Sequence, residues 1–142
     1  MTDASVFDSV GMAPSKRNLA LKKAGLISVI DDDMAVRNST KTLLRSLGYS
    51  VATFASAEEF LNSDQVSDTS CVITDVRMSG MSGLDLQSRL KARGDRMPVI
   101  FMTAFPEAKV QEQALAGGAH GFLVKPYREQ LLIDYVESAL RA

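Results

Sequence analysis

The chain has 142 residues, of which 46% are hydrophobic and 23% are charged. This size and composition predict one ordinary globular domain with a sizeable core and leave no length for a second domain. The 16 Lys and Arg residues are balanced by 17 Asp and Glu residues, for a net charge of −1. Neither a basic surplus for binding nucleic acid nor an acidic, solvating tail is therefore indicated.

The cysteine content and the hydropathy exclude two further classes of protein. A single cysteine, Cys71, lies in an apolar run, which excludes an internal disulfide framework and is typical of a buried thiol in a reducing compartment. No run approaches the roughly 20 apolar residues of a membrane span, and polar residues interrupt the segment where a signal peptide needs a continuous apolar stretch. We expect a cytoplasmic protein without membrane contact.

Residues 1–24 mix Ser, Gly, Pro and Lys without a clear hydrophobic period. We predict that they form a flexible tail and that the folded domain spans residues 25–142. Within that domain, short apolar runs start 24, 21, 27 and 23 residues apart, at 26–30, 50–54, 71–74, 98–102 and 121–124. Because these runs are apolar throughout rather than alternating, they predict strands buried on both faces.

The gaps between the runs carry helical signals. Two apolar stripes have helical spacing: Val36, Leu43, Leu44 and Leu47, and Leu131, Leu132, Tyr135, Val136, Ala139 and Leu140. Ser56 followed by Glu59 is a capping-box pattern that predicts a helix start. Gly48 and the pair Gly117 and Gly118 predict helix ends.

Strands that alternate with helices in this way predict an α/β fold. We expect an open, doubly wound sheet of five parallel strands, flanked by five helices and joined by right-handed crossovers. In such sheets, ligands bind beyond the carboxyl ends of the strands, where the strand order reverses. The residues that directly follow each run are therefore the candidates for function.

Acidic, hydroxyl and amine side chains follow four of the runs: Asp31, Asp32 and Asp33; Asp75; Thr103; and Lys125. Clustered carboxylates need a cation among them, and a set of oxygen ligands favours Mg²⁺. With Mg²⁺ present, Asp75 can attack phosphorus, Lys125 can neutralise the phosphoryl oxygens and Thr103 can donate a hydrogen bond to one of them. The small Ala104 leaves room for the phosphoryl group. The pattern predicts phosphoryl transfer.

Each of these residues also has a purely structural interpretation. Residues 31–33 could cap the helix that follows them, Thr103 could support the strand end, and Lys125 could be a solvated loop residue. The coincidence at four strand ends favours a shared function over capping alone. His120 has no second ligand nearby in the sequence, so we expect a turn residue there.

Five segments carry a resemblance to a known family: VIDDD at 29–33, ITDVRM at 73–78, MTA at 102–104, GGA at 117–119 and VKPY at 124–127. In their order and spacing they resemble the receiver domain of two-component response regulators, over about residues 26–140. The ITDVRM segment is most similar to the FixJ-type subset, whose receivers usually precede a DNA-binding helical domain. The resemblance implies a flavodoxin-like fold of the receiver type.

The resemblance also implies a role for each site residue. It assigns binding of Mg²⁺ to three carboxylates and one backbone carbonyl: Asp31, Asp32, Asp75 and Arg77. Asp75 would be the phosphoacceptor, Thr103 the switch hydroxyl and Lys125 the lysine that contacts phosphate. Phe122, three residues before Lys125, would be the aromatic switch residue.

These roles imply a signalling switch and not a metabolic enzyme. A sensor histidine kinase or a phosphotransfer protein would donate a phosphoryl group to Asp75, and the added charge would draw Thr103 toward it. Phe122 would turn into the vacated space and change the surface presented to an unknown output protein or, as a homodimer, to a second copy. Direct binding of nucleic acid by this chain is not expected, because it has neither a basic stripe nor a helix-turn-helix segment.

Two features depart from the family's pattern. Ser79 follows Met78 where the family commonly has proline, so we expect a looser turn and a lower affinity for Mg²⁺. Nothing follows Ala142, while a tail precedes the domain, so we expect either a stand-alone receiver or an excised one.

The main alternative is an enzyme, a phosphatase similar to haloacid dehalogenases. Asp31 would then be the nucleophile and Asp33 the general acid. However, Ala35 stands where that family has Thr or Val, no acidic pair follows the later strands, and Asp75 would have no role. A flavodoxin-like electron carrier fits less well, because three acids after the first run would repel the phosphate of its cofactor.

Overall fold

The computed structural model describes residues 25–141, in which five strands alternate with five helices. The strands are β1 (Leu26–Ile30), β2 (Ser50–Phe54), β3 (Thr69–Asp75), β4 (Val99–Thr103) and β5 (Gly121–Val124). The helices are α2 (Met34–Ser46), α3 (Ala57–Leu61), α4 (Gly83–Ala92), α5 (Ala108–Ala116) and α6 (Glu129–Arg141). The predicted flexible tail, residues 1–24, lies outside the described residues.

All five strands pair in parallel, in the order β2-β1-β3-β4-β5. This arrangement confirms the predicted open, doubly wound sheet, and the strand order reverses between β1 and β3. β3 begins at Thr69, ahead of its apolar run, where Thr69 pairs with Leu26 and its Oγ1 lies 2.7 Å from Ser28 Oγ. The topology brings the carboxyl ends of β1, β3, β4 and β5 to one edge of the sheet.

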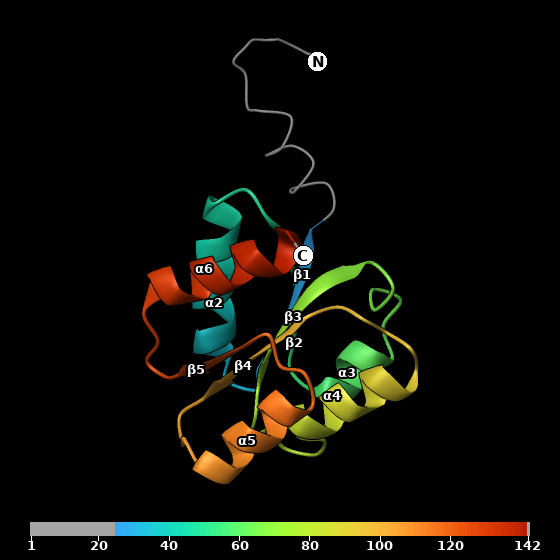
Figure 1. Ribbon diagram of the computed structural model, residues 1–142. Coiled ribbons are helices and arrows are strands. Elements are labelled where there is room, and N and C mark those ends of the chain that lie inside the picture. Colours follow the sequence, from blue (N-terminus) through green and yellow to red (C-terminus); the bar gives the residue numbers. More distant parts are fainter. Residues whose placement is uncertain (1–24, 142) are drawn as a thin grey trace, which may run out of the picture.

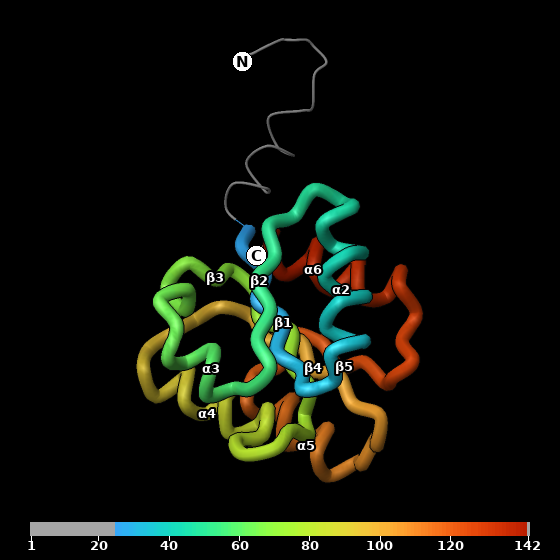
Figure 2. Tube along the Cα trace, turned by 180° about the vertical axis from the view of Figure 1, so that it is seen from behind, coloured from blue at the N-terminus to red at the C-terminus, as the bar shows by residue number. Residues whose placement is uncertain are grey.

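Helices cover both faces of the sheet and form an apolar layer on each (Figures 1 and 2). On one face, α2 and α6 pack against the strands through buried residues that include Leu44, Leu132, Val136, Ile27, Ile73 and Ile100. On the other face, α3, α4 and α5 contribute to a second layer that includes Phe60, Leu86, Ala114, Ile30, Val72 and Phe101. Burial of each large side chain contributes about 1.5–3 kcal/mol to folding. The two layers therefore supply the main driving force for the fold.

Polar side chains fix where three of the helices begin. Asp33 accepts hydrogen bonds from two backbone N–H groups in the first turn of α2. Ser56 accepts the N–H of Glu59 at 3.0 Å, which confirms the predicted start of α3. Ser82 and Asp85 form a reciprocal capping box at the start of α4. These caps satisfy N–H groups that have no partner within the helix.

Glycines follow the ends of α2 and α5, as predicted. The buried apolar stripes of the helices are narrower than predicted. Gly48 and Gly118 have positive φ angles of 96° and 94° just after α2 and α5, a conformation that glycine adopts without steric cost. Leu47 and Leu131, which belong to the predicted apolar stripes, are each 42% exposed. Leu47 lies at the C-cap of α2 and Leu131 in the first turn of α6, so both stand at the edges of the packed region.

Cys71 lies in the interior of β3 as a free, fully buried thiol. Burial raises the pKa of this thiol to about 12, so it stays protonated at neutral pH. The prediction of a buried thiol is confirmed. No helix within residues 25–141 is both long and apolar enough to span a membrane.

The last turn of α6 lies beside the start of β1 (Figure 1). Arg141 interacts electrostatically with Tyr49, which directly precedes β2. Both ends of the described chain therefore lie at the amino ends of the strands. The opposite edge of the sheet carries the predicted site residues.

Candidate functional site

Three carboxylates gather at the carboxyl ends of β1 and β3. Asp31 and Asp32 directly follow β1, and Asp75 is the last residue of β3. One oxygen of each carboxylate lies within 4.8 Å of the others. Asp31 is fully buried and Asp75 is 7% exposed, whereas Asp32 is open to solvent. The structure thus brings together the three acids that the sequence singled out as cation ligands.

Lys125 lies between the two buried carboxylates. It directly follows β5, and its Nζ donates hydrogen bonds of 2.7 Å to Asp31 Oδ2 and 2.7 Å to Asp75 Oδ2. These partners lie 94 and 50 residues away along the chain. The bonds are charge-assisted because they join an ammonium group to carboxylates. They are largely shielded from water because the Lys125 side chain is only 14% exposed.

Burial and ion pairing act in opposite directions on these groups. Burial raises the pKa of Asp31, and the hydrogen bonds from Lys125 and the backbone offset part of that effect. Burial by itself lowers the pKa of Lys125, but the bonds to Asp31 and Asp75 outweigh it, and the pKa is raised overall. The amine therefore stays protonated at neutral pH and acts as the counter-charge of two buried carboxylates.

Backbone N–H groups hold the other oxygens of the buried acids. Asp31 Oδ1 accepts the N–H of Asp33 at 2.9 Å, and Asp75 Oδ1 accepts the N–H of Arg77 at 3.0 Å. Each carboxylate is therefore fixed by a backbone donor on one oxygen and by Lys125 on the other. Two such bonds leave a carboxylate little freedom to rotate.

The three consecutive acids after β1 divide into two roles. The side chain of Asp33 caps α2, so the structural interpretation holds for this residue. Asp31 and Asp32 instead point their carboxylates toward that of Asp75. Of the two interpretations that the sequence leaves open, capping therefore applies to Asp33, whereas Asp31 and Asp32 belong to the acidic cluster.

Thr103 ends β4 and is almost fully buried. Its Oγ1 accepts the N–H of Phe105 at 3.0 Å, which closes the turn after β4. The adjacent Ala104 is exposed and lines a pocket. Phe122 on β5 is half-buried, and its ring centroid lies 6.4 Å from that of Phe101. Thr103 and Phe122 thus lie on neighbouring strands, close to the edge that holds the acids.

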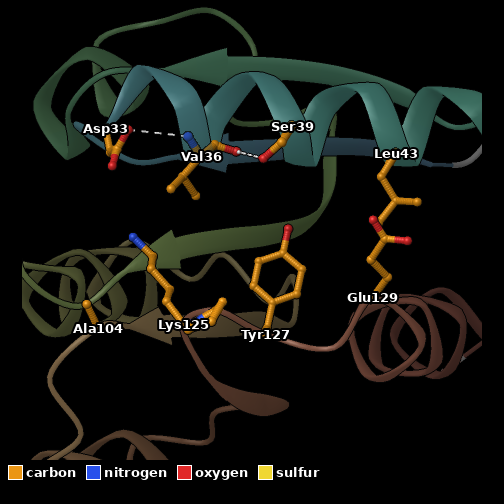
Figure 3. Close-up of a pocket in the computed structure, with 9 residues that line it drawn as sticks. Asp33, Val36, Ser39, Leu43, Ala104, Lys125, Tyr127 and Glu129 are labelled. Carbon is orange, nitrogen blue, oxygen red and sulfur yellow. Dashed lines mark hydrogen bonds between the residues drawn. The ribbon is translucent and has the colours of Figure 1, made fainter.

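The pocket has a volume of about 490 Å³ and opens between α2 and the segment that leads from β5 into α6 (Figure 3). Val36 and Leu43 line the wall formed by α2, and the ring of Tyr127 lines the opposite wall (Figure 3). The Tyr127 hydroxyl points toward α2 and lies 2.7 Å from Thr40 Oγ1. This contact ties the segment behind Lys125 to α2.

Several loop contacts around the site have no counterpart in the sequence patterns. The Arg77 guanidinium pairs with Glu107 at 2.6 Å and lies 5.8 Å from the centre of the Phe105 ring. Glu58 accepts the backbone N–H of Met81 at 3.0 Å. The partners belong to different loops and elements, so no local period could have indicated them.

His120 lies away from the acids, just before β5. Its Nε2 lies 2.7 Å from Ser138 Oγ on α6, and its backbone N–H donates to the Val99 carbonyl at 2.8 Å. These contacts give His120 a structural role, in agreement with the prediction of a turn residue.

The sequence matches the family model of the response regulator receiver domain over residues 27–137. The chain belongs to this family. The receiver is 45% identical over 117 residues to the transcriptional regulatory protein TdiR of Thauera aromatica, in a match that covers 82% of this chain and 52% of TdiR. It is 43% identical over 114 residues to the transcriptional regulatory protein FixJ of Azorhizobium caulinodans, which covers 80% of this chain and 54% of FixJ.

Solved structures agree with this assignment. The response regulator StyR superposes with a TM-score of 0.77 at 41% identity, over 82% of this chain and 59% of StyR. The structure named FixJ-N superposes with a TM-score of 0.74 at 29% identity, over 82% of this chain and 94% of that one. The resemblance to receivers and to the FixJ-type subset is therefore confirmed. The receiver spans about half the length of the curated relatives that it matches.

Family membership and the acidic pocket together identify a phosphoacceptor switch and not a metabolic enzyme. The phosphatase alternative is not supported. Its general acid, Asp33, caps α2, and its nucleophile, Asp31, is fully buried against Lys125.

Proposed function

We propose that Asp75 accepts a phosphoryl group from the phosphohistidine of a sensor histidine kinase or a phosphotransfer protein. The observation that carries the proposal is the position of Asp75, bonded to Lys125 beside two other carboxylates, with 11% of its side chain exposed. Asp31 shares the lysine but is fully buried, so a phosphodonor cannot reach it. Asp32 is accessible, but among the described residues the Lys125 ammonium bonds to Asp31 and Asp75 and not to Asp32.

The residues present fit a hard divalent cation, which we propose to be Mg²⁺. Asp31, Asp32 and Asp75 offer oxygen atoms within 4.8 Å of one another, and oxygens are the ligands that Mg²⁺ prefers. The backbone carbonyl of Arg77 would join this set. When bound, the ion supplies positive charge that neutralises the oxygens of the transferred group.

The chain's own residues carry the transfer. One Asp75 oxygen forms a bond to phosphorus while the P–N bond of phosphohistidine breaks, and the freed imidazole keeps the electron pair of that bond. The Lys125 ammonium, 2.7 Å from Asp75, neutralises negative charge on the phosphoryl oxygens. The Thr103 hydroxyl donates a hydrogen bond to one of them, and Ala104 leaves room for the group.

We propose that Thr103 and Phe122 transmit the change. The Thr103 hydroxyl now accepts the N–H of Phe105, so a turn toward a phosphoryl group on Asp75 breaks this bond and alters the loop after β4. Phe122, half-buried beside Phe101, then moves into the vacated space. The surface formed by α5, β5 and α6 changes as a result.

The partners follow from this assignment as proposals. An output protein, still unidentified, would read the altered surface, and a second copy of the chain could bind to it in the phosphorylated state. TdiR and FixJ are named as transcriptional regulators, but the balanced charge of this chain supports no direct contact with nucleic acid. A cytoplasmic location without membrane contact accords with this role.

Labelling with a small phosphodonor tests the proposal. The wild-type receiver with acetyl phosphate and Mg²⁺ should gain the mass of one phosphoryl group, and Asp75→Asn should gain none. Asp64→Asn, a change at an exposed acid in the loop before β3, is the matched control and should be labelled like the wild type. Labelling of Asp75→Asn at the wild-type rate would overturn the assignment.

A further inference from the structure

The loop between β3 and α4, residues 76–82, is tied by its backbone to two carboxylates from other elements. The N–H of Ser79 donates to Asp32 Oδ2 at 3.3 Å, and the N–H of Met81 donates to Glu58 Oε2 at 3.0 Å. Asp32 directly follows β1, and Glu58 lies in the first turn of α3. The position of the loop therefore depends on both elements.

Glu58 fills the space beside Gly80. Gly80 has a φ of 79°, and a Cβ placed on it would lie 2.6 Å from Glu58 Oε2. The positive φ and the missing side chain together allow the carboxylate to approach the loop backbone. The hydrogen bond from Met81 is the main cause that lowers the pKa of Glu58. Glu58 is therefore ionised at neutral pH while it holds the loop.

Asp32 is held differently from the other two acids of the pocket. Asp31 and Asp75 each accept one bond from Lys125 and one from a backbone N–H of their own segment. Within residues 25–141, the hydrogen bond that the exposed Asp32 carboxylate accepts comes from Ser79, across 47 residues of sequence. It uses Oδ2 and leaves Oδ1 available to a cation. The orientation of Asp32 thus depends on the loop.

This donor exists because residue 79 is not proline. Proline, which the family commonly has here, carries no backbone N–H and could not make the bond to Asp32. From the sequence alone, serine here predicts a looser turn and weaker binding of Mg²⁺ than proline. The bond from the Ser79 N–H to Asp32 favours the opposite result, and the bond from Met81 to Glu58 restrains the turn.

We infer that Glu58 and the Ser79 amide are positioning groups for the cation site. Glu58 fixes the loop, the loop presents the Ser79 N–H, and this N–H orients the Asp32 carboxylate toward the ion. The inference rests on the proposed function, since it takes Mg²⁺ as the ion of the acidic pocket. Contacts to the ligands of a metal commonly change its affinity tenfold or more. The exposure of Asp32 leads us to expect an effect of about fivefold.

Calorimetric titration of the unphosphorylated receiver with Mg²⁺ tests whether the Ser79 N–H orients Asp32. Ser79→Pro removes the N–H and should raise the Kd about fivefold. Ser79→Ala keeps the N–H and loses only the hydroxyl, so its Kd should stay within about twofold of the wild-type value. A Ser79→Pro variant that is folded by circular dichroism and binds Mg²⁺ as tightly as Ser79→Ala would overturn the inference.

Glu58 provides a second, independent test should the proline variant not fold. Glu58→Ala removes the acceptor of the Met81 N–H and should raise the Kd about threefold, whereas Glu58→Gln keeps an acceptor oxygen and should raise it less. Because both groups act through one loop, adding Glu58→Ala to Ser79→Pro should raise the Kd little further. Equal affinities for Glu58→Ala and the wild type would show that Glu58 does not position the loop.

The dependence of labelling on Mg²⁺ separates positioning from catalysis. With acetyl phosphate, the Mg²⁺ concentration for half-maximal labelling should rise in Ser79→Pro, while the rate at saturating Mg²⁺ stays near that of Ser79→Ala. A wild-type receiver that binds no Mg²⁺ would remove the cation site and this inference with it. Normal binding by the wild type together with an unshifted Ser79→Pro would remove the inference alone and leave the proposed function intact.

Discussion

The carboxyl edge of the sheet and the two apolar layers are stabilised by different forces. In the layers, fully buried side chains such as Leu132 and Phe60 need only close contact with apolar neighbours. At the edge, Asp31, Asp75 and Lys125 are charged groups largely removed from water, and each depends on its partner. The layers favour folding outright, whereas the edge roughly balances a desolvation cost against pairing.

This difference separates stability from function in one small domain. A pocket of pre-paired charges can exchange one partner for another, such as an incoming phosphoryl group, without disturbing the apolar layers. Substitutions in a layer should therefore change the free energy of unfolding and leave the site unaffected. Substitutions of the paired charges at the edge should change both.

Leu132→Ala should have the largest effect on stability. Leu132 is fully buried in the layer formed by α2 and α6, and loss of its side chain should lower the free energy of unfolding by about 2–5 kcal/mol. Urea denaturation measures this loss. The Mg²⁺ affinity of the folded variant should equal that of the wild type, and a tenfold weaker affinity would contradict the separation of layer and edge.

Lys125→Met should have the next largest effect. At pH 7 without Mg²⁺, removal of the counter-charge from two buried carboxylates should cost about 3 kcal/mol. Burial already raises the pKa of Asp31, and loss of Lys125 should raise it further. A carboxyl with a raised folded pKa loses stability as the pH rises through that value, so the deficit relative to the wild type should shrink at pH 5. Urea denaturation at pH 7 and pH 5 measures the deficit in the free energy of unfolding. Equal deficits at the two pH values would contradict this account.

Alkaline pH should destabilise the layers through Cys71. Burial raises the pKa of this thiol from 9.0 to about 12, so the unfolded chain releases its proton first and stability falls as the pH rises above 9. The expected loss is about 1.4 kcal/mol for each pH unit in that range. Cys71→Ala should lack this part of the pH dependence. Parallel stability curves for the two proteins between pH 9 and 10.5 would exclude the thiol as its source.

Asp33→Ala should have the smallest effect and tests the division of roles among the three acids. Loss of the cap on α2 should cost about 1 kcal/mol, which Asp33→Ser should largely restore because serine also caps helices. Thermal unfolding measures both changes. Asp33 lies outside the acidic cluster, so labelling of Asp75 should proceed normally. Loss of labelling in Asp33→Ala would show that Asp33 also acts at the acidic pocket and is not only a helix cap.

The strands and their order of appearance are predictable because each buried strand leaves an uninterrupted apolar run. The runs coincide with β1, β2 and β5. β4 begins at Val99 and not at Pro98, since proline has no N–H for the ladder. β3 extends back to Thr69 because that polar residue finds a buried partner in Ser28, which the apolar pattern cannot reveal.

The site is predictable only where its residues stand at strand ends. Asp31, Asp75 and Lys125 meet because parallel strands share one edge, a consequence of topology that the sequence already implies. The loop contacts from Ser79 and Met81 were not predictable. Their partners lie 47 and 23 residues away, and their distances depend on how α3 packs against the sheet, which no short motif encodes.

The position of the last turn of α6 has a practical consequence. It lies beside the start of β1, at the edge of the sheet opposite Asp75 (Figure 1). A biotin or fluorophore coupled beyond Arg141 would therefore face away from the acidic pocket. Receiver immobilised through such a handle should remain accessible to a kinase and to metal ions, which suits it to surface-based affinity measurements.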